Sequence, residues 1–183
     1  MNRMSEPLAT GETLTVLLSA EQIQARIGEL ADTIRGDYGD EPLLLVGVLK
    51  GSYMFLSDLA KELPGEVTVD FVQTSSYGEG KSSSGIVQIR KDLDINIEGR
   101  HVLLVEDIVD TGATLAHLRE LLSTRRPKSL KVVALLSKPE ARRTPTAVEY
   151  VGFEIPNQFV VGYGLDYAER FRNLPYVAIF QGE

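Results

Sequence analysis

The sequence contains no cysteine and only two histidines, His101 and His117. The first absence excludes disulfide bonds, zinc sites built on thiolates and cysteine nucleophiles, and it favours a reducing compartment. The second excludes a metal centre built from several histidines. We therefore expect a cytoplasmic protein.

Long hydrophobic runs and an excess of positive charge are also missing. No apolar run approaches the roughly 20 residues needed to cross a bilayer, and residues 1–14 lack the basic-then-apolar pattern of a signal peptide. With 26 acidic and 19 basic residues, the net charge is -7, which disfavours broad binding to nucleic acid or to an anionic membrane. We expect neither as a partner.

What remains is an ordinary globular composition. The chain has 183 residues, of which 43% are hydrophobic and 25% charged, enough for one domain with a substantial core. No internal repeat or long linker divides it. We expect residues 1–12 to be a flexible tail and residues 13–183 to form a single domain.

Hydrophobic periodicity predicts alternating strands and helices. A helix is expected to begin after Ser19, which forms a capping box with Gln22. Its apolar stripe consists of Ile23, Ile27, Leu30, Ala31 and Ile34. The expected helices are 19–39, 52–63 and 112–126, and the expected strands are 42–51, 66–77, 85–93, 100–107, 129–138, 148–155, 158–164 and 176–180. This order predicts an α/β fold with a mainly parallel, twisted sheet and helices on both faces.

Polar residues interrupt three of these strands at their carboxyl ends, where ligands bind in open α/β sheets. They are Lys50-Gly51, Glu106-Asp107 and Lys138. A lysine at a strand end is more often a solvated cap than a ligand group, so position alone assigns no role to Lys138. Two nucleotide motifs are absent: Ser75 stands where a P-loop ending at Gly80-Lys81-Ser82 needs its first glycine, and no G-x-G-x-x-G follows a strand.

The stretch "EDIVDTGAT", residues 106–114, carries the strongest chemical signal. One interpretation is simple capping of the next helix by Asp110 or Thr111. It leaves unexplained why Glu106 and Asp107 follow a buried strand directly. The other interpretation is that residues 110–114 surround a phosphate with backbone N–H groups, while Glu106 and Asp107 accept hydrogen bonds from sugar hydroxyls or bind Mg²⁺ through oxygen.

The segment "VLLVEDIVDTGATL" resembles the phosphoribosyl-pyrophosphate signature of type I phosphoribosyltransferases. The similarity extends from about residue 43 to 180, and "VGVLKGSYMFLSDL", "VDFVQTSSYG", "LLSK" and "VGFEIPNQFVVGYGLDYAERFRNLPYV" resemble members that act on hypoxanthine and guanine. The resemblance implies the type I fold, with a small hood and a flexible hairpin lid beside the main sheet.

The resemblance also implies a role for individual residues. Phosphoribosyl and phosphate binding falls to Glu106, Asp107, Asp110, Thr111, Gly112, Ala113 and Thr114. Pyrophosphate binding falls to Lys50 and Gly51, in a loop that often carries a non-proline cis peptide, and to Arg172. Purine binding falls to Lys138, Phe159 and Val160, metal binding to Glu106, Asp107 and Asp166, and lid closure to Ser76 and Tyr77. Asp110 is the implied catalytic base. Ala113 departs from family members that carry lysine there, which removes a positive charge near the ligand.

The implied reaction transfers 5-phosphoribosyl from phosphoribosyl pyrophosphate to hypoxanthine or guanine, with Mg²⁺ as cofactor and a homodimer or homotetramer as the assembly. Two alternatives stay open. One is a transferase of the same fold that acts on xanthine or a pyrimidine. The other is a regulator that senses phosphoribosyl pyrophosphate and binds nucleic acid, although the chain shows neither an extra domain nor a basic balance of charge for it. The sequence does not rank hypoxanthine, guanine and xanthine.

Overall fold

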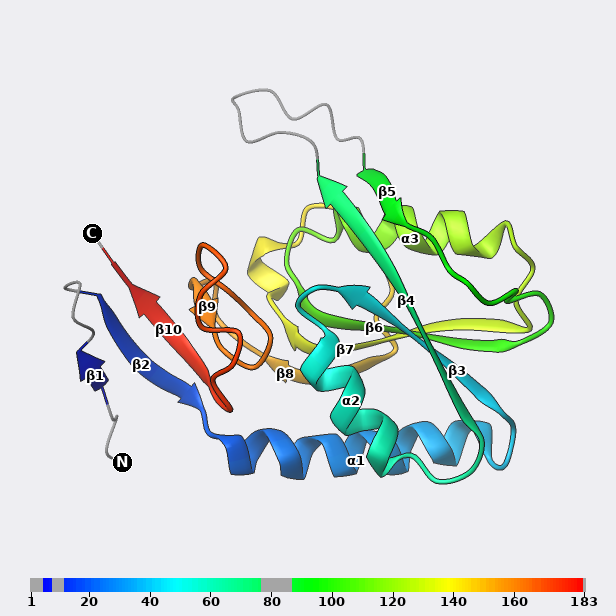
Figure 1. Ribbon diagram of the computed structural model, residues 1–183, viewed down its shortest axis with the longest axis horizontal. Helices are drawn as coiled ribbons and strands as arrows, with labels where there is room; N and C mark the ends of the chain where they lie inside the picture. The colour runs from blue at the N-terminus through cyan, green and yellow to red at the C-terminus, as the bar shows by residue number, and fades with distance from the viewer. Residues whose placement is uncertain (1–4, 8–11, 77–86, 183) are drawn as a thin grey trace.

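Two β-sheets form the framework of the molecule (Figure 1). The computed structural model describes residues 5–7, 12–76 and 87–182. In this part of the chain a six-stranded sheet has the order β5-β4-β3-β6-β7-β8, and a four-stranded sheet has the order β1-β2-β10-β9. Among the described residues, no helix is long and apolar enough to cross a membrane.

The six-stranded sheet is mainly parallel, as the sequence predicts. It consists of β3 (Leu43–Leu49), β4 (Val67–Ser76), β5 (Val87–Lys91), β6 (His101–Val109), β7 (Ser129–Ser137) and β8 (Tyr150–Glu154). Only β5 runs antiparallel, as the second strand of a hairpin with β4. The parallel direction brings the carboxyl ends of β3, β6 and β7 to one edge.

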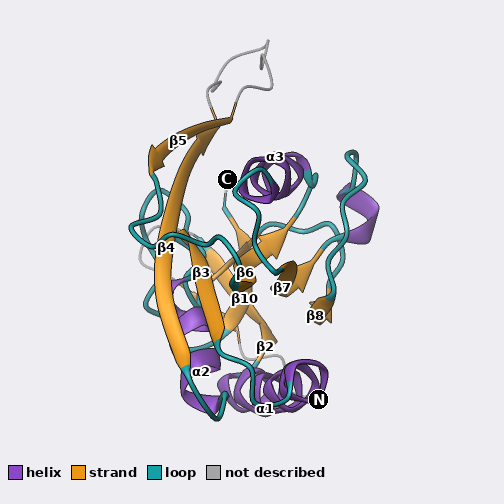
Figure 2. Cartoon of the chain, turned by 90° about the vertical axis from the view of Figure 1, so that its right-hand side faces the viewer, coloured by secondary structure: helices purple, strands orange, loops and turns teal. Residues whose placement is uncertain are grey.

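Helices cover both faces of this sheet (Figure 2). Helices α1 (Ala20–Tyr38) and α2 (Tyr53–Glu62) lie on one face, and α3 (Ala113–Ser123) lies on the other. Alternate residues of one strand point into different layers: Leu43 and Leu45 pack with α1 and α2, whereas Leu44 and Val46 pack with α3. A strand buried on both faces needs a continuous hydrophobic run, which explains the sequence of β3.

Helix α1 confirms its predicted beginning and face. The Ser19 side chain accepts a hydrogen bond from the Gln22 backbone, and the Gln22 side chain accepts one from the Ser19 backbone N–H. The predicted stripe is buried against the sheet, with Ile23, Ile27 and Ile34 all at 0% exposure. Most of the stability of such a helix comes from this packed face.

The four-stranded sheet is the part that the sequence did not predict as a unit. It is antiparallel and consists of β1 (Ser5–Pro7), β2 (Thr13–Leu18), β9 (Val160–Val161) and β10 (Val177–Gln181). No element had been assigned to residues 13–18, and β1 lies in the stretch expected to be a tail. The division into a tail and one domain stays a prediction. Figure 1 shows this sheet beside the carboxyl edge of the large one, in the place expected for the hood.

Candidate active site

Three segments of the chain come into close contact at two glycines at the carboxyl edge of the large sheet. A Cβ atom added to Gly51, just after β3, would lie 1.6 Å from Oδ2 of Asp107 in β6. One added to Gly164 would lie 2.0 Å from the carbonyl oxygen of Gly51. Glycine is therefore required at both positions. The Leu49–Lys50 peptide bond beside this junction is cis, as the resemblance implied for this loop.

Of the two acidic residues at the end of β6, Glu106 is buried and Asp107 is partly buried. Glu106 is 6% exposed, and burial, reinforced by the charge of Asp107, raises the pKa of its carboxyl well above the usual range. Burial also raises the pKa of Asp107 to about 6, although a hydrogen bond from the Ile108 backbone and the charge of Arg172 oppose this shift. Carboxylates with raised pKa values at a strand end are typical of functional sites.

The loop after β6 forms a small cavity of about 170 Å³, lined by Glu106, Ile108, Val109, Asp110, Thr111, Gly112, Thr114 and Leu115. Gly112 has a φ of 86° and is itself the N-cap of α3, without a side-chain cap hydrogen bond. The simple-capping interpretation is therefore wrong for Asp110, whereas the Thr111 hydroxyl accepts a long hydrogen bond from the Ala113 backbone N–H. The backbone N–H groups of Arg143 and Thr144 donate to the Thr111 carbonyl oxygen and so fix the position of the loop.

Ala113 is the first residue of α3, and its backbone N–H faces the Thr111 hydroxyl at 3.5 Å. The backbone N–H groups at the beginning of a helix carry partial positive charge and bind anions. The departure at Ala113 therefore lies at a position where the main chain itself supplies donors.

Lys138 and Asp110 come together next to this cavity. Lys138 follows β7, and its side chain is 8% exposed, yet Nζ lies 3.6 Å from Oδ2 of Asp110, which is 50% exposed. The Lys138 backbone N–H also donates to the Val109 carbonyl oxygen at 3.0 Å. A buried ammonium group and a carboxylate open to solvent thus form one pair at the rim of the cavity.

An aromatic cluster contributes a second, larger cavity of about 460 Å³, lined by Phe159, Tyr167, Phe180, Gln181 and Gly182. Phe159 is 52% exposed, and its ring lies 6.0 Å, edge to face, from the rings of Tyr167 and Phe180. Neighbouring Val160 is 5% exposed. Sequence reasoning named Phe159 and Val160 but missed Tyr167 and Phe180, because no local pattern links position 180 with position 159.

Charged residues from the loop between β9 and β10 complete the junction. Arg172 pairs with Asp166 at 2.9 Å and donates to the Gly164 carbonyl oxygen at 2.8 Å. Lys50 pairs with Glu169 at 2.9 Å, with both side chains more than half exposed. The charges of Arg172 and Asp166 both act on the pKa of Asp107, so the loop faces the end of β6.

The predicted lid lies only in part within the described residues. Ser76 ends β4, while Tyr77 and the rest of the expected lid through residue 86 lie outside the described residues.

For the metal, no three acidic or histidine side chains gather as a ligand cluster within residues 5–7, 12–76 and 87–182. Mg²⁺ usually binds through one or two carboxylates together with substrate phosphates, and the oxygen donors of Glu106 and Asp107 fit that chemistry.

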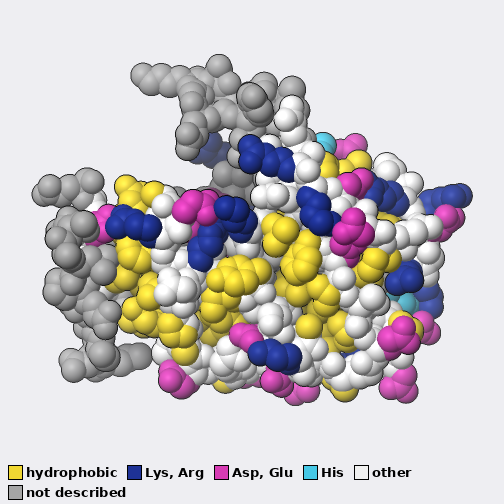
Figure 3. Space-filling view, in the orientation of Figure 1, with side chains coloured by type: hydrophobic (Ala, Val, Ile, Leu, Met, Phe, Trp, Pro, Cys, Tyr) yellow, Lys and Arg dark blue, Asp and Glu magenta, His cyan; other side chains and the backbone are white. Residues whose placement is uncertain are grey.

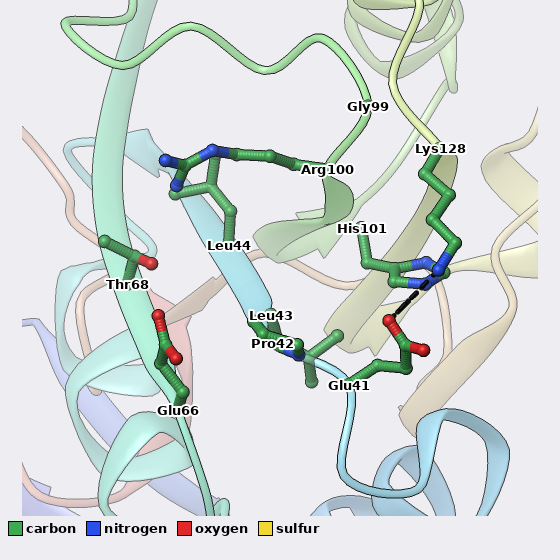
Figure 4. A pocket seen from close by; sticks show the side chains of 10 residues that line it. All are labelled: Glu41, Pro42, Leu43, Leu44, Glu66, Thr68, Gly99, Arg100, His101 and Lys128. Carbon is green, nitrogen blue, oxygen red and sulfur yellow. Dashed lines mark hydrogen bonds and ion pairs between the residues drawn. The ribbon is translucent and has the colours of Figure 1, made fainter.

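A further cavity, of about 350 Å³, lies at the opposite edge of the sheet, where β3, β4 and β6 begin (Figure 4). It contains none of the predicted site residues. Its Glu41 is neutralised by Lys128 at 3.0 Å and faces His101 Nε2 at 3.6 Å. In α/β sheets ligands bind at the carboxyl edge, so we place the candidate active site there.

Comparison with known proteins identifies the family of the chain. A family model described as "Phosphoribosyl transferase domain" matches residues 13–168. The chain belongs to the phosphoribosyl transferase family. Among its relatives in that family, the hypoxanthine-guanine phosphoribosyltransferase of Mycobacterium avium is 53% identical over 176 residues, which is 93% of this chain and 87% of the relative. That of Bacillus subtilis is 49% identical over 91% of this chain and 92% of the relative.

Solved phosphoribosyltransferase structures share the fold as well. A hypoxanthine phosphoribosyltransferase from Staphylococcus aureus has a TM-score of 0.87 at 49% identity and covers 91% of this chain and 90% of its own. A hypoxanthine-guanine phosphoribosyltransferase from Bacillus anthracis, with a HEPES molecule in its active site, has a TM-score of 0.86 at 46% identity and covers 90% and 96%. The predicted type I phosphoribosyltransferase fold is confirmed.

Proposed function

We propose that this chain transfers 5-phosphoribosyl from phosphoribosyl pyrophosphate to hypoxanthine or guanine, giving IMP or GMP and pyrophosphate in purine salvage. The observation that carries this proposal is the pairing of buried Lys138 with half-exposed Asp110 at the rim of the phosphate-loop cavity. A 6-oxopurine presents an acceptor at O6 and a nitrogen at N7 on one edge, and this pair offers a donor and a proton acceptor at the matching spacing.

The donor half of the reaction is assigned to the ends of β3 and β6. Backbone N–H groups of Thr111 to Thr114 hold the 5-phosphate, and Glu106 and Asp107 accept hydrogen bonds from the ribose hydroxyls. Lys50, Gly51 and Arg172 bind pyrophosphate. Gly51 lies against Asp107 with no side chain between them, so the phosphate, ribose and pyrophosphate positions follow one another along a continuous surface.

The acceptor half is assigned to Lys138, Phe159 and Val160. The ammonium group of Lys138 donates to O6, the exposed ring of Phe159 stacks on the base, and the Val160 backbone reads the base edge. Adenine has an amino group at this position, which would leave two donors facing each other. Such a mismatch disfavours binding, because a site built for one hydrogen bond leaves its polar group unpaired with the wrong ligand.

In the chemical step the bond between ribose C1 and the pyrophosphate oxygen breaks, a bond from the base nitrogen to C1 forms, and the base loses one proton. Asp110, placed near N7, accepts that proton or stabilises the charge that develops there. The cationic sugar must be protected from water. We assign this to the segment that carries Ser76 and Tyr77, as a lid that closes over the site.

We propose Mg²⁺ as the cofactor, with Glu106 and Asp107 at one position and Asp166 at a second. When bound, Mg²⁺ supplies charge neutralisation for the departing pyrophosphate. The carboxylate oxygens of Glu106 and Asp107 support the assignment, since Mg²⁺ binds through one or two carboxylates together with substrate phosphates.

A base panel tests the proposal. Purified protein with phosphoribosyl pyrophosphate and Mg²⁺ is assayed with hypoxanthine, guanine, xanthine, adenine and a pyrimidine. We expect nucleotide and pyrophosphate to form in equal amounts with hypoxanthine or guanine and not with adenine. Turnover of xanthine or a pyrimidine alone would favour the transferase of different specificity. No turnover together with a shift of DNA or RNA mobility at low salt would favour the regulator.

We also propose a homodimer or homotetramer in the cytoplasm. Figure 3 shows hydrophobic side chains gathered across the middle of the face that carries α2 and β4, where Tyr53 and Val69 are 40% and 38% exposed. Such patches on soluble proteins often mark contacts between subunits. Light scattering coupled to size exclusion gives the assembly mass directly, and a monomer at micromolar concentration would contradict this part of the proposal.

A further inference from the structure

The turn from Gly162 to Leu165 has an unusual residue at its centre. Its ends exchange two backbone hydrogen bonds, of 2.9 and 3.1 Å, and the two central residues, Tyr163 and Gly164, have φ values of 49° and 98°. Turns with positive φ at both central positions favour asparagine, aspartate and glycine, and a bulky residue there is rare. The side chain of Tyr163 must therefore contribute something that the turn itself does not require.

That side chain reaches into the protein and ends on a carboxylate. Tyr163 is 2% exposed, and its hydroxyl donates to Oδ2 of Asp58 in α2 at 2.5 Å. Asp58 is fixed in turn by Gln24 of α1, which donates to it at 3.0 Å, and by Lys61 at 2.6 Å. The tyrosine thus ties the turn to both helices on that face of the sheet.

The opposite side of the same turn touches the candidate active site. Gly164 lies directly against the carbonyl oxygen of Gly51. Its backbone N–H donates to the Arg172 carbonyl oxygen at 2.9 Å, and its carbonyl oxygen accepts from the Arg172 guanidinium at 2.8 Å. A displacement of the turn would therefore move both Gly51 and Arg172, which come from loops more than a hundred residues apart.

We propose that the Tyr163–Asp58 hydrogen bond is a positioning contact that sets the pyrophosphate half of the site. It holds the turn against Gly51 and so fixes the spacing between the loop after β3 and Arg172. Neither residue touches the substrate: the Tyr163 hydroxyl is engaged by α2. The inference rests on the proposed function, because pyrophosphate is the ligand that those groups are assigned to bind.

The chain supplies a matched control at the far edge of the sheet. Tyr150, at the beginning of β8, is 5% exposed and donates to Oδ2 of Asp37 at 2.5 Å, and Asp37 pairs with Lys131 at 2.9 Å. The chemistry resembles that at Tyr163, with a buried tyrosine, an aspartate and a lysine, but here Lys131 also donates to the Tyr150 hydroxyl at 3.0 Å. Loss of the Tyr150 hydroxyl should therefore cost at least as much stability as loss of the Tyr163 hydroxyl, but only Tyr163 lies next to the site.

The test compares Tyr163→Phe with Tyr150→Phe in the full chain. Both should lower the melting temperature, Tyr150→Phe at least as much as Tyr163→Phe. In Tyr163→Phe we expect the KM for phosphoribosyl pyrophosphate and the inhibition constant of pyrophosphate to rise roughly ten- to a hundredfold, the scale of a small misplacement of binding groups. The dissociation constant of IMP, which has no pyrophosphate, should stay within about twofold of wild type. Asp58→Asn, which keeps an acceptor for the hydroxyl, should raise the KM less than Asp58→Leu.

Three results would overturn the inference. They are an unchanged KM for phosphoribosyl pyrophosphate in Tyr163→Phe, an equal rise in Tyr150→Phe, or an equal loss of IMP affinity, which would each reduce the contact to a general contribution to stability. If wild type is active and one of these is found, the inference fails alone. If wild type neither transfers phosphoribosyl nor binds pyrophosphate, the proposed function fails together with it.

Discussion

At the scale of single residues, the site combines side chains with opposite relations to water. Lys138 is almost fully buried, whereas its partner Asp110 is half exposed. Because its side chain is buried, Lys138 has few alternative conformations, and its ammonium group stays in one position, which suits recognition of O6. The aspartate keeps freedom to approach a bound base and return, which suits transfer of a proton.

Asp110→Asn should therefore lower kcat far more than it weakens binding of phosphoribosyl pyrophosphate. The amide keeps the size and the loop but does not accept a proton, and loss of a general base costs roughly 10²–10⁴ in rate. Steady-state kinetics together with a binding titration separates the two effects. A variant with nearly normal kcat would remove Asp110 from the role of base.

Lys138→Met should weaken binding of hypoxanthine and guanine and reduce discrimination against adenine. Methionine fills a similar volume, and a hydrogen bond from a charged donor contributes about 1.5–3 kcal/mol, which corresponds to roughly a ten- to hundredfold rise in KM for the base. Affinity for phosphoribosyl pyrophosphate should change little. Competition between guanine and adenine is the measurement, and unchanged selectivity would show that another group reads O6.

At the scale of elements, the site depends on three segments in close contact: Gly164 meets the backbone of Gly51, and Gly51 meets the side chain of Asp107. A methyl group added at Gly51 or at Gly164 would overlap atoms of the neighbouring segment. Because β3 and β6 are adjacent and parallel, their ends are fixed by the sheet. The third segment has no such support from the large sheet, which is why its tie through Tyr163 matters for the arrangement.

Gly51→Ala tests this junction. The added Cβ atom would lie 1.6 Å from Oδ2 of Asp107, so loop and carboxylate must separate, and we expect kcat/KM to fall by roughly 10²-fold. Gly28→Ala in α1 is the control, because a Cβ atom added to Gly28 has no neighbouring atom within 4 Å. This substitution should add about 0.5–1 kcal/mol to the free energy of unfolding without changing activity. Wild-type activity in Gly51→Ala would show that the contact is not needed.

At the scale of the whole molecule, local patterns predicted the large sheet and its helices well. The continuous apolar runs of β3, β6 and β7 and the stripe of α1 depend on neighbours in sequence. The second sheet could not be predicted in this way, because β2 pairs with β10 from the other end of the chain. Tyr163 and Asp58 are 105 positions apart, so no periodic pattern in the sequence predicts their hydrogen bond. The site residues around Asp110 could be predicted because they all lie in one short segment of the sequence.

The buried Glu106 and the partly buried Asp107 should make stability depend on pH in a specific direction. Burial raises the pKa of Asp107 from 3.8 to about 6, so the folded chain holds this proton more tightly than the unfolded chain does. The resulting stabilisation is complete below about pH 4 and is lost as pH rises through about 6. In metal-free protein, Asp107→Asn should therefore gain stability relative to wild type over this range, by on the order of 1–3 kcal/mol.

Urea unfolding of both proteins in chelator, at several pH values from about 4 to 7, measures this difference. Relief of Glu106 from the Asp107 charge acts in the same direction. Paired surface carboxylates such as Asp37, whose pKa is lowered by its hydrogen bond with Tyr150, have the opposite dependence but cancel between the two proteins. A difference that does not change with pH would mean that Asp107 is not desolvated as described.

The central claim is that one site at the carboxyl edge of the large sheet binds phosphoribosyl pyrophosphate and the purine together. A crystal structure with Mg²⁺, phosphoribosyl pyrophosphate and a non-reactive 6-oxopurine analogue tests it most directly. We predict the 5-phosphate on the backbone N–H groups of residues 111–114 and the 6-oxygen within hydrogen-bonding distance of Lys138 Nζ. Ligand bound instead in the cavity beside Arg100 and His101, at the opposite edge (Figure 4), or a base away from Lys138, would contradict the account.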